Sequence, residues 1–212
     1  MGNRLPNISD KHKVCIICEG NEEYRYMERL IKLRVWSDNY SISLVNAEGN
    51  GNIPARYQDR YQSDSYEAVL VFCDTEKKPF EQYSDIKRKI NEFHGVENAA
   101  DEVVIFANPC TLQIVSKHWT DDVIKTPAKP VNASLIEKYT GVTNYKARMD
   151  QLDKVMEYIN EENYTQMKDR LTGADTDDSV IGSTNFMRLL QGLESNDSGW
   201  IKTINDRLED CE

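Results

Sequence analysis

Three continuous apolar runs in the first half of the chain constrain its fold more than any other feature. They read VCIIC at residues 14–18, AVLVFC at 68–73 and VVIFA at 103–107. A run that is apolar at every position suits a strand buried on both faces, as in a parallel sheet covered by helices. Helical spacing separates the runs, and this alternation indicates an α/β fold. We therefore predict a roughly four-stranded, mostly parallel sheet flanked by helices over residues 1–125.

The other elements of this half follow from apolar spacing and from turn residues. A short strand at 42–45 completes the sheet. Pro54 begins one short helix, Pro79 begins a longer one, and Gly95 closes the latter. The predicted helices cover residues 22–36, 54–62, 79–93 and 110–119.

The second half of the chain shows only helical periodicity. The segment TPAKPVN at 126–132 carries two prolines and predicts a loop and a domain boundary. We therefore expect a helical C-terminal portion over residues 126–212, following the α/β domain. The helices expected there cover about 134–139, 144–162, 164–171, 183–194 and 198–209.

Composition narrows the class of protein. No apolar run approaches the roughly 18–20 residues of a membrane span, and the first residues lack the apolar core of a secretory signal. We therefore expect a cytoplasmic protein without membrane contact. The net charge of −10 argues against a broadly basic, nonspecific nucleic-acid surface. Cys15 and Cys18 form a CxxC pair without a second ligand pair, and we interpret them as small core residues rather than as a zinc site.

Acidic residues follow two of the apolar runs directly. Glu19 and Gly20 end the first run, and Asp74 ends the second, with Glu76 two residues later. The carboxyl ends of parallel strands meet at one edge of the sheet, where such proteins bind ligands. Each acid alone could equally be a helix cap. Both together favour a site for Mg²⁺ or Mn²⁺, which prefer oxygen ligands.

These motifs resemble the Toprim domain, in which one strand ends in Glu-Gly and another in an acidic pair spaced D-x-D. More narrowly, CEGNEEYRYMERL is similar to the CEGxTEPxYF opening of the RloB-like small Toprim proteins of prokaryotic defence systems. NPCTLQIVSKHW at 108–119 is similar to that family's NPCFELW segment. The resemblance covers about residues 13–119, and the matching positions are Glu19, Gly20, Glu23, Tyr26, Asn108, Pro109 and Cys110.

The resemblance implies a metal-dependent nuclease that hydrolyses phosphodiesters of DNA or RNA in anti-phage defence. Glu19 would be the catalytic acid/base or an additional metal ligand, assisted by Glu23, while Asp74 and Glu76 would bind the metal. The candidate substrate contacts are Lys77, Lys78 and Asn108. An ATPase partner and a homo-oligomeric state stay open.

Three departures from the family pattern keep a second hypothesis open. Glu76 replaces the usual Asp, Glu22 replaces Thr, and Thr111-Leu112 replaces Phe-Glu. With the acidic net charge, these changes also suit a noncatalytic Toprim-fold module that binds a partner protein or nucleic acid. His118 has no histidine partner at ligand spacing, so we interpret it as a packing or capping residue.

Overall fold

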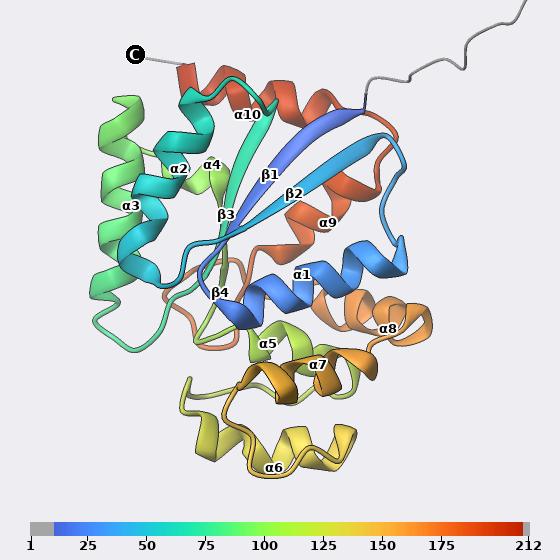
Figure 1. Cartoon of the computed structure of the whole chain (residues 1–212). Coiled ribbons are helices and arrows are strands. Elements are labelled where there is room, and N and C mark those ends of the chain that lie inside the picture. The colour runs from blue at the N-terminus through green and yellow to red at the C-terminus, as the bar shows by residue number, and fades with distance from the viewer. Residues whose placement is uncertain (1–10, 210–212) are drawn as a thin grey trace, which may run out of the picture.

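The computed structural model describes residues 11–209 and confirms the predicted α/β fold. Four strands form a parallel sheet in the order β2-β1-β3-β4 (Figure 1). They are β1 (His12–Cys18), β2 (Tyr40–Asn46), β3 (Ala68–Asp74) and β4 (Val104–Ala107). Cys15 and Cys18 are fully buried and free in β1, as expected for core residues. Because the strand order reverses direction at β1, the loops after β1 and β3 flank a topological switch point.

Helices cover both faces of the sheet. α1 (Asn21–Leu33) lies on one face, and α2 (Ile53–Gln62) and α3 (Glu81–His94) lie on the other (Figure 1). α9 (Phe186–Glu194) joins α1, because the Phe186 ring lies 5.3 Å from the Phe72 ring of β3 and 5.7 Å from the Tyr26 ring of α1. The first face of the sheet is therefore covered by helices from both halves of the chain.

Several element boundaries differ from the predicted ones. α1 ends at Leu33 because Arg34 adopts a left-handed backbone conformation. α3 begins at Glu81, and a short helix, α4 (Ala99–Val103), precedes β4 without having been predicted. The predicted helix at 110–119 consists of α5 (Leu112–Val115) and a 3₁₀ turn, Ser116–His118.

The helical second half contains α6 (Lys129–Thr140), α7 (Met149–Glu157), α8 (Glu161–Leu171), α9 and α10 (Gly199–Glu209). The predicted loop at 126–132 is wrong from Lys129 onward. Pro130 lies in the first turn of α6, where a missing N–H leaves no helical hydrogen bond unmade. The single helix predicted at 144–162 is also wrong, because Asn160 caps a new helix and accepts a hydrogen bond from the Asn163 N–H at 3.0 Å.

The second half packs on the α/β core at several places. α6 and α7 lie beyond the carboxyl ends of the strands (Figure 1), and α10 contacts α4 and β3. None of the helices in the described part of the chain has the length and apolar character that a membrane span requires.

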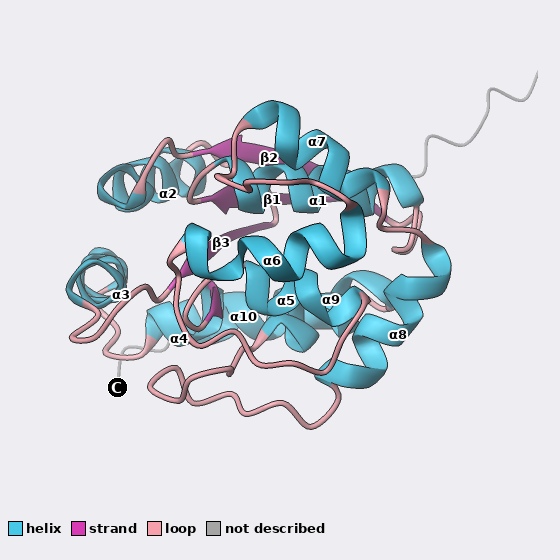
Figure 2. Ribbon diagram, turned by 90° about the horizontal axis from the view of Figure 1, so that it is seen from below, coloured by secondary structure: helices cyan, strands magenta, loops and turns pink. Residues whose placement is uncertain are grey.

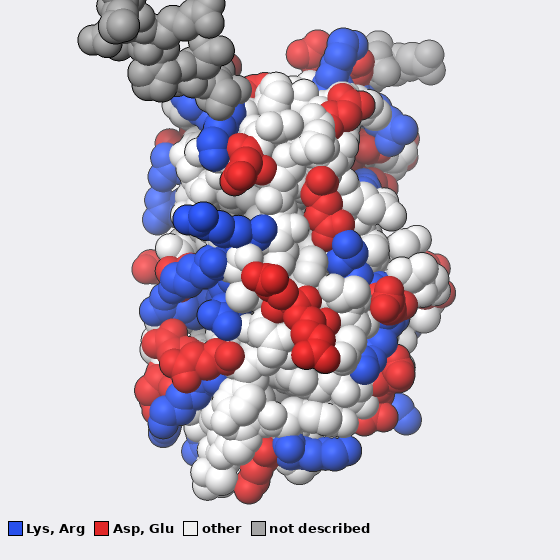
Figure 3. Space-filling model, turned by 90° about the vertical axis from the view of Figure 1, so that its right-hand side faces the viewer, with Lys and Arg blue, Asp and Glu red and all other residues white. Residues whose placement is uncertain are grey.

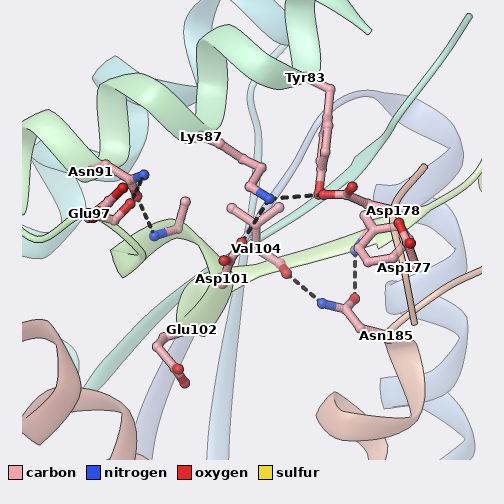
Figure 4. Close-up of polar contacts among 12 residues, drawn as sticks. Tyr83, Lys87, Asn91, Glu97, Asp101, Glu102, Val104, Asp177, Asp178 and Asn185 are labelled. Atoms are coloured by element: carbon pink, nitrogen blue, oxygen red, sulfur yellow. Dashed lines mark hydrogen bonds and ion pairs between the residues drawn. The ribbon is translucent and has the colours of Figure 1, made fainter. Parts of the chain in front are cut away.

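The outer edge of β4 is closed by side chains of the segment before α9. The Asn185 amide accepts a hydrogen bond from Phe106 N–H at 2.8 Å and donates one to the Val104 carbonyl at 2.8 Å (Figure 4). It thereby replaces a neighbouring strand. Beside it, a cavity of about 660 Å³ opens between α3, α9 and residues 171–178. Lys87 crosses this region and pairs with Asp101 and Asp178, at 2.8 and 2.9 Å.

Candidate acidic site at the carboxyl ends of the strands

Glu19 lies at the switch point, directly after β1. Its backbone N–H donates to the Phe72 carbonyl of β3 at 3.0 Å, and its carbonyl accepts from Gly49 N–H at 2.8 Å. Its side chain turns toward β3, where one carboxylate oxygen accepts from the Asp74 N–H at 2.9 Å. The Asn50 amide, oriented with its nitrogen toward Glu19, lies 2.7 and 2.8 Å from the two oxygens. Backbone and side chain thus fix Glu19 against the end of β3.

Asp74 and Glu23 meet at Thr111. The Thr111 N–H donates to Asp74 Oδ1 at 2.7 Å, and the Thr111 hydroxyl lies 2.8 Å from the same oxygen and 2.6 Å from Glu23 Oε1. The second Glu23 oxygen accepts from Gly20 N–H at 2.9 Å. A hydroxyl has one proton to donate. It can serve both carboxyl groups only if one of them is protonated and donates in return.

Glu22, on the same turn of α1, is paired with the helical second half. One of its oxygens accepts from the Tyr145 hydroxyl at 2.7 Å. The other forms a close ion pair with Lys129, the first residue of α6. The site is therefore assembled from both halves of the chain.

Glu76 adjoins this cluster from the loop after β3. Its backbone has φ +63°, a left-handed conformation that is uncommon for a non-glycine residue. Its N–H donates to the Pro109 carbonyl at 3.1 Å, and its side chain is half-buried. No hydrogen bond to the Glu76 carboxylate occurs within residues 11–209.

The carboxyl groups of the cluster disfavour each other's charge. Burial, with the charge of Glu23 and against the opposing hydrogen bond from Asp74 N–H, raises the pKa of Glu19 to about 8. Burial, with the charges of Glu23 and Glu19, raises the pKa of Asp74 well above its ordinary range. Burial also raises the pKa values of Glu23 and Glu76. The charge of Lys129 opposes the rise at Glu19 only in part, so a further proton or a cation would stabilise this group of acids.

The oxygen atoms of the site are of the chemical type that binds a hard divalent cation. Asp74 Oδ2 and both Glu76 oxygens have no hydrogen-bond partner in the described range. Thr75 lies between the two residues in the sequence, and its hydroxyl is fully buried and likewise unpartnered among those residues. Carboxylate and hydroxyl oxygens are ligands that Mg²⁺ and Mn²⁺ prefer. Across residues 11–209, however, no three His, Cys, Asp or Glu side chains converge into a finished metal cluster.

The three candidate substrate contacts lie in different environments. Lys77 and Lys78 are exposed on the loop next to Glu76, and neither forms an ion pair with a described residue. Asn108 is buried, and its amide donates to the Asp178 carbonyl at 2.7 Å. In this arrangement Asn108 holds the loop before α9, whereas the two lysines face solvent beside the acids.

Several basic side chains of α1 and α3 pair with acids of the same helix. In α1, Arg25 and Lys32 both pair with Glu28. In α3, Lys89 pairs with Asp85. The face shown in Figure 3, which is the right-hand side of Figure 1, has its basic side chains interspersed with acidic ones. Lysines near the acidic cluster are thus better candidates for phosphate contact than these helix faces.

Several members of the site were not identified from the sequence. In the sequence, Thr111 stands out only as a departure from the family pattern, and Asn50 carries no signal. Glu22 was noted as a substitution for Thr, while Lys129 and Tyr145 carried no signal. His118 was interpreted as a packing residue, and it is fully buried, with its ring nitrogens 3.1 Å from the Tyr26 hydroxyl and 2.9 Å from Asn163 Oδ1.

Comparison with models of protein families, with curated proteins and with solved structures found no match.

Proposed function

We propose that this protein is a metal-dependent nuclease of the Toprim type that hydrolyses phosphodiester bonds of DNA or RNA with Mg²⁺ or Mn²⁺. The observation that carries the proposal is a set of buried acids linked by hydrogen bonds at the switch point of a parallel sheet: Glu19 accepts from the Asp74 N–H, and Thr111 joins Asp74 to Glu23. Ligands bind in such folds at this place. The resemblance to the RloB-like family adds the expectation of a role in prokaryotic defence.

In this proposal Asp74 and Glu76 hold the metal, with Glu19 as a further ligand or as the acid/base. The bound ion would supply Lewis-acid stabilisation of charge on the phosphate. Glu19 has a pKa of about 8 in the metal-free protein, and a cation bound beside it would lower this pKa. Thr111 orients Asp74, because its hydroxyl lies within hydrogen-bond distance of that carboxylate. Glu23 in turn holds the Thr111 hydroxyl in place.

Lys77 and Lys78 are proposed to bind the nucleic-acid backbone beside the metal. Both are exposed and close in sequence to Glu76. Their ammonium groups would contact phosphates without reading sequence. The net charge of −10 makes such local contacts more suitable than a broad basic track.

The experiment is cleavage of labelled single- and double-stranded DNA and RNA with Mn²⁺ or Mg²⁺, with EDTA as a control. Wild type is compared with Glu19→Gln and with Glu48→Gln, a matched change at an exposed glutamate two residues from Asn50. We expect cleavage that requires both the metal and Glu19 and that survives the change at Glu48. Cleavage that persists in EDTA, or in Glu19→Gln, would refute the assignment.

The second candidate is a noncatalytic module of the same fold that binds a partner protein or nucleic acid. It is favoured by the lack of a finished metal cluster among residues 11–209. It predicts a folded protein that binds nucleic acid or a partner without turnover under any metal condition. The same cleavage assay, combined with a binding assay on the labelled substrates, separates the two functions.

A further inference from the structure

Lys129 brings a positive charge from the helical second half to the acidic site. It is the first residue of α6, which lies in front of the carboxyl ends of the strands when the molecule is seen from below (Figure 2). Its ammonium pairs with Glu22 Oε2, and the Tyr145 hydroxyl donates to the other Glu22 oxygen. Glu22 is therefore fixed from two sides and holds Lys129 at the site.

The Lys129 ammonium is partly buried, which disfavours its positive charge. Burial lowers its pKa to about 8, and the charge of Glu19 opposes that shift. Lys129 is therefore within electrostatic reach of the proposed acid/base as well as of Glu22. The ammonium has three N–H donors, and its one ion-pair partner in the described part of the chain is Glu22. Two donors are left for a ligand.

We infer that Lys129 contacts the substrate directly, binding a non-bridging oxygen of the phosphate that is cleaved, while Glu22 and Tyr145 position its ammonium. This inference rests on the proposed nuclease function and gives the helical second half a part in it. Preorganised cations directed at a transferring phosphoryl group stabilise the charge that develops there. Because the hydroxyl of Tyr145 donates to Glu22, Tyr145 is a positioning residue.

A purely structural ion pair is the alternative, and a double variant separates the two. Removing one partner of a buried pair leaves an uncompensated charge, whereas removing both does not. If Lys129 only balanced Glu22, the Glu22→Gln/Lys129→Gln double variant would recover the activity lost in Lys129→Gln. If Lys129 binds the phosphate, the double variant folds as well as wild type and stays impaired.

The test measures kcat and KM for the substrate that wild type cleaves, using Lys129→Gln, Lys129→Arg, the double variant and Lys125→Gln. Lys125 is an exposed lysine four residues away and serves as the matched control. We expect kcat/KM to fall about 10²–10³-fold in Lys129→Gln and in the double variant, as for loss of one preorganised donor. Lys129→Arg should recover part of it, and Lys125→Gln should stay within about threefold of wild type.

Metal binding is read independently by the rise in melting temperature with Mn²⁺. This rise should persist in the double variant, because Lys129 and Glu22 are not proposed ligands. Full activity in Lys129→Gln, or recovery in the double variant, would overturn the inference while the nuclease assignment stands. A wild type that cleaves no substrate would overturn the nuclease assignment and this inference with it.

Discussion

Replacing Glu19 with Gln should stabilise the metal-free protein, although it should abolish the proposed activity. The pKa of Glu19 is raised to about 8 in the folded chain, from an ordinary value of 4.5. A carboxyl group with a raised folded-state pKa stabilises the protein below its unfolded pKa, and this stabilisation is lost as pH rises through the folded pKa. Relative to acid conditions, wild type therefore loses stability between about pH 4.5 and pH 8.

The magnitude follows from the shift. At about 1.36 kcal/mol per pKa unit, the loss is under about 1 kcal/mol at pH 5 and about 4 kcal/mol at pH 8. Gln loses a charge-assisted hydrogen bond worth about 1 kcal/mol. Part of the free-energy cost of ionising Glu19 is also shared with Asp74 and Glu23, because the three acids titrate together. We expect Glu19→Gln to be more stable than wild type by roughly 2–3 kcal/mol at pH 8, or roughly 5–10 °C in melting temperature.

The assay is urea unfolding in EDTA at pH 5 and pH 8, with Glu48→Gln as the control. The difference between Glu19→Gln and wild type should grow with pH, and the control should show no such growth. Saturating Mn²⁺ should reverse the order, because a ligand that binds the folded wild type stabilises it. A folded Glu19→Gln protein that is no more stable than wild type at pH 8 would refute the reasoning that these acids lack a cation.

Three further changes test other parts of the structure. Thr111→Val should lower stability by about 1–3 kcal/mol and weaken Mn²⁺ binding, whereas Thr111→Ser keeps the hydroxyl and should resemble wild type in unfolding and calorimetry. His118→Gln should flatten stability between pH 6.5 and 4. Burial lowers the His118 pKa to about 4, so the unfolded chain alone takes up a proton as pH falls, and wild type loses about 3 kcal/mol there. Asn185→Ala should cost about 2–4 kcal/mol in urea unfolding, since Phe106 N–H and the Val104 carbonyl lose their partner; an unchanged midpoint would contradict that role.

The sequence predicted the sheet and the positions of its acids because both depend on local patterns. A continuous apolar run specifies a strand buried on both faces, and an acid after such a run must lie at the sheet edge. That is why the prediction placed Glu19 and Asp74 at the ends of β1 and β3. Prolines were less informative, because Pro130 lies in the first turn of α6 where a loop was expected.

The rest of the site depends on contacts between distant residues. Glu22 and Lys129 are 107 positions apart, and neither has a pattern that indicates the other. Thr111 bridges Glu23 and Asp74 only because the chain turns immediately after β4. Such pairings arise from the packing of α6 and α5 against the strand ends, which periodicity cannot specify.

Calorimetric titration of Mn²⁺ into wild type and into Asp74→Asn tests the central claim most directly. Asn keeps the shape of the side chain and an oxygen for the Thr111 hydrogen bonds, but it removes the charge that the metal needs. We predict saturable binding to wild type and at least roughly tenfold weaker binding to Asp74→Asn, as expected when a charged ligand is lost. Equal affinity in the two proteins, or no binding to either, would contradict a metal site at the carboxyl ends of β1 and β3.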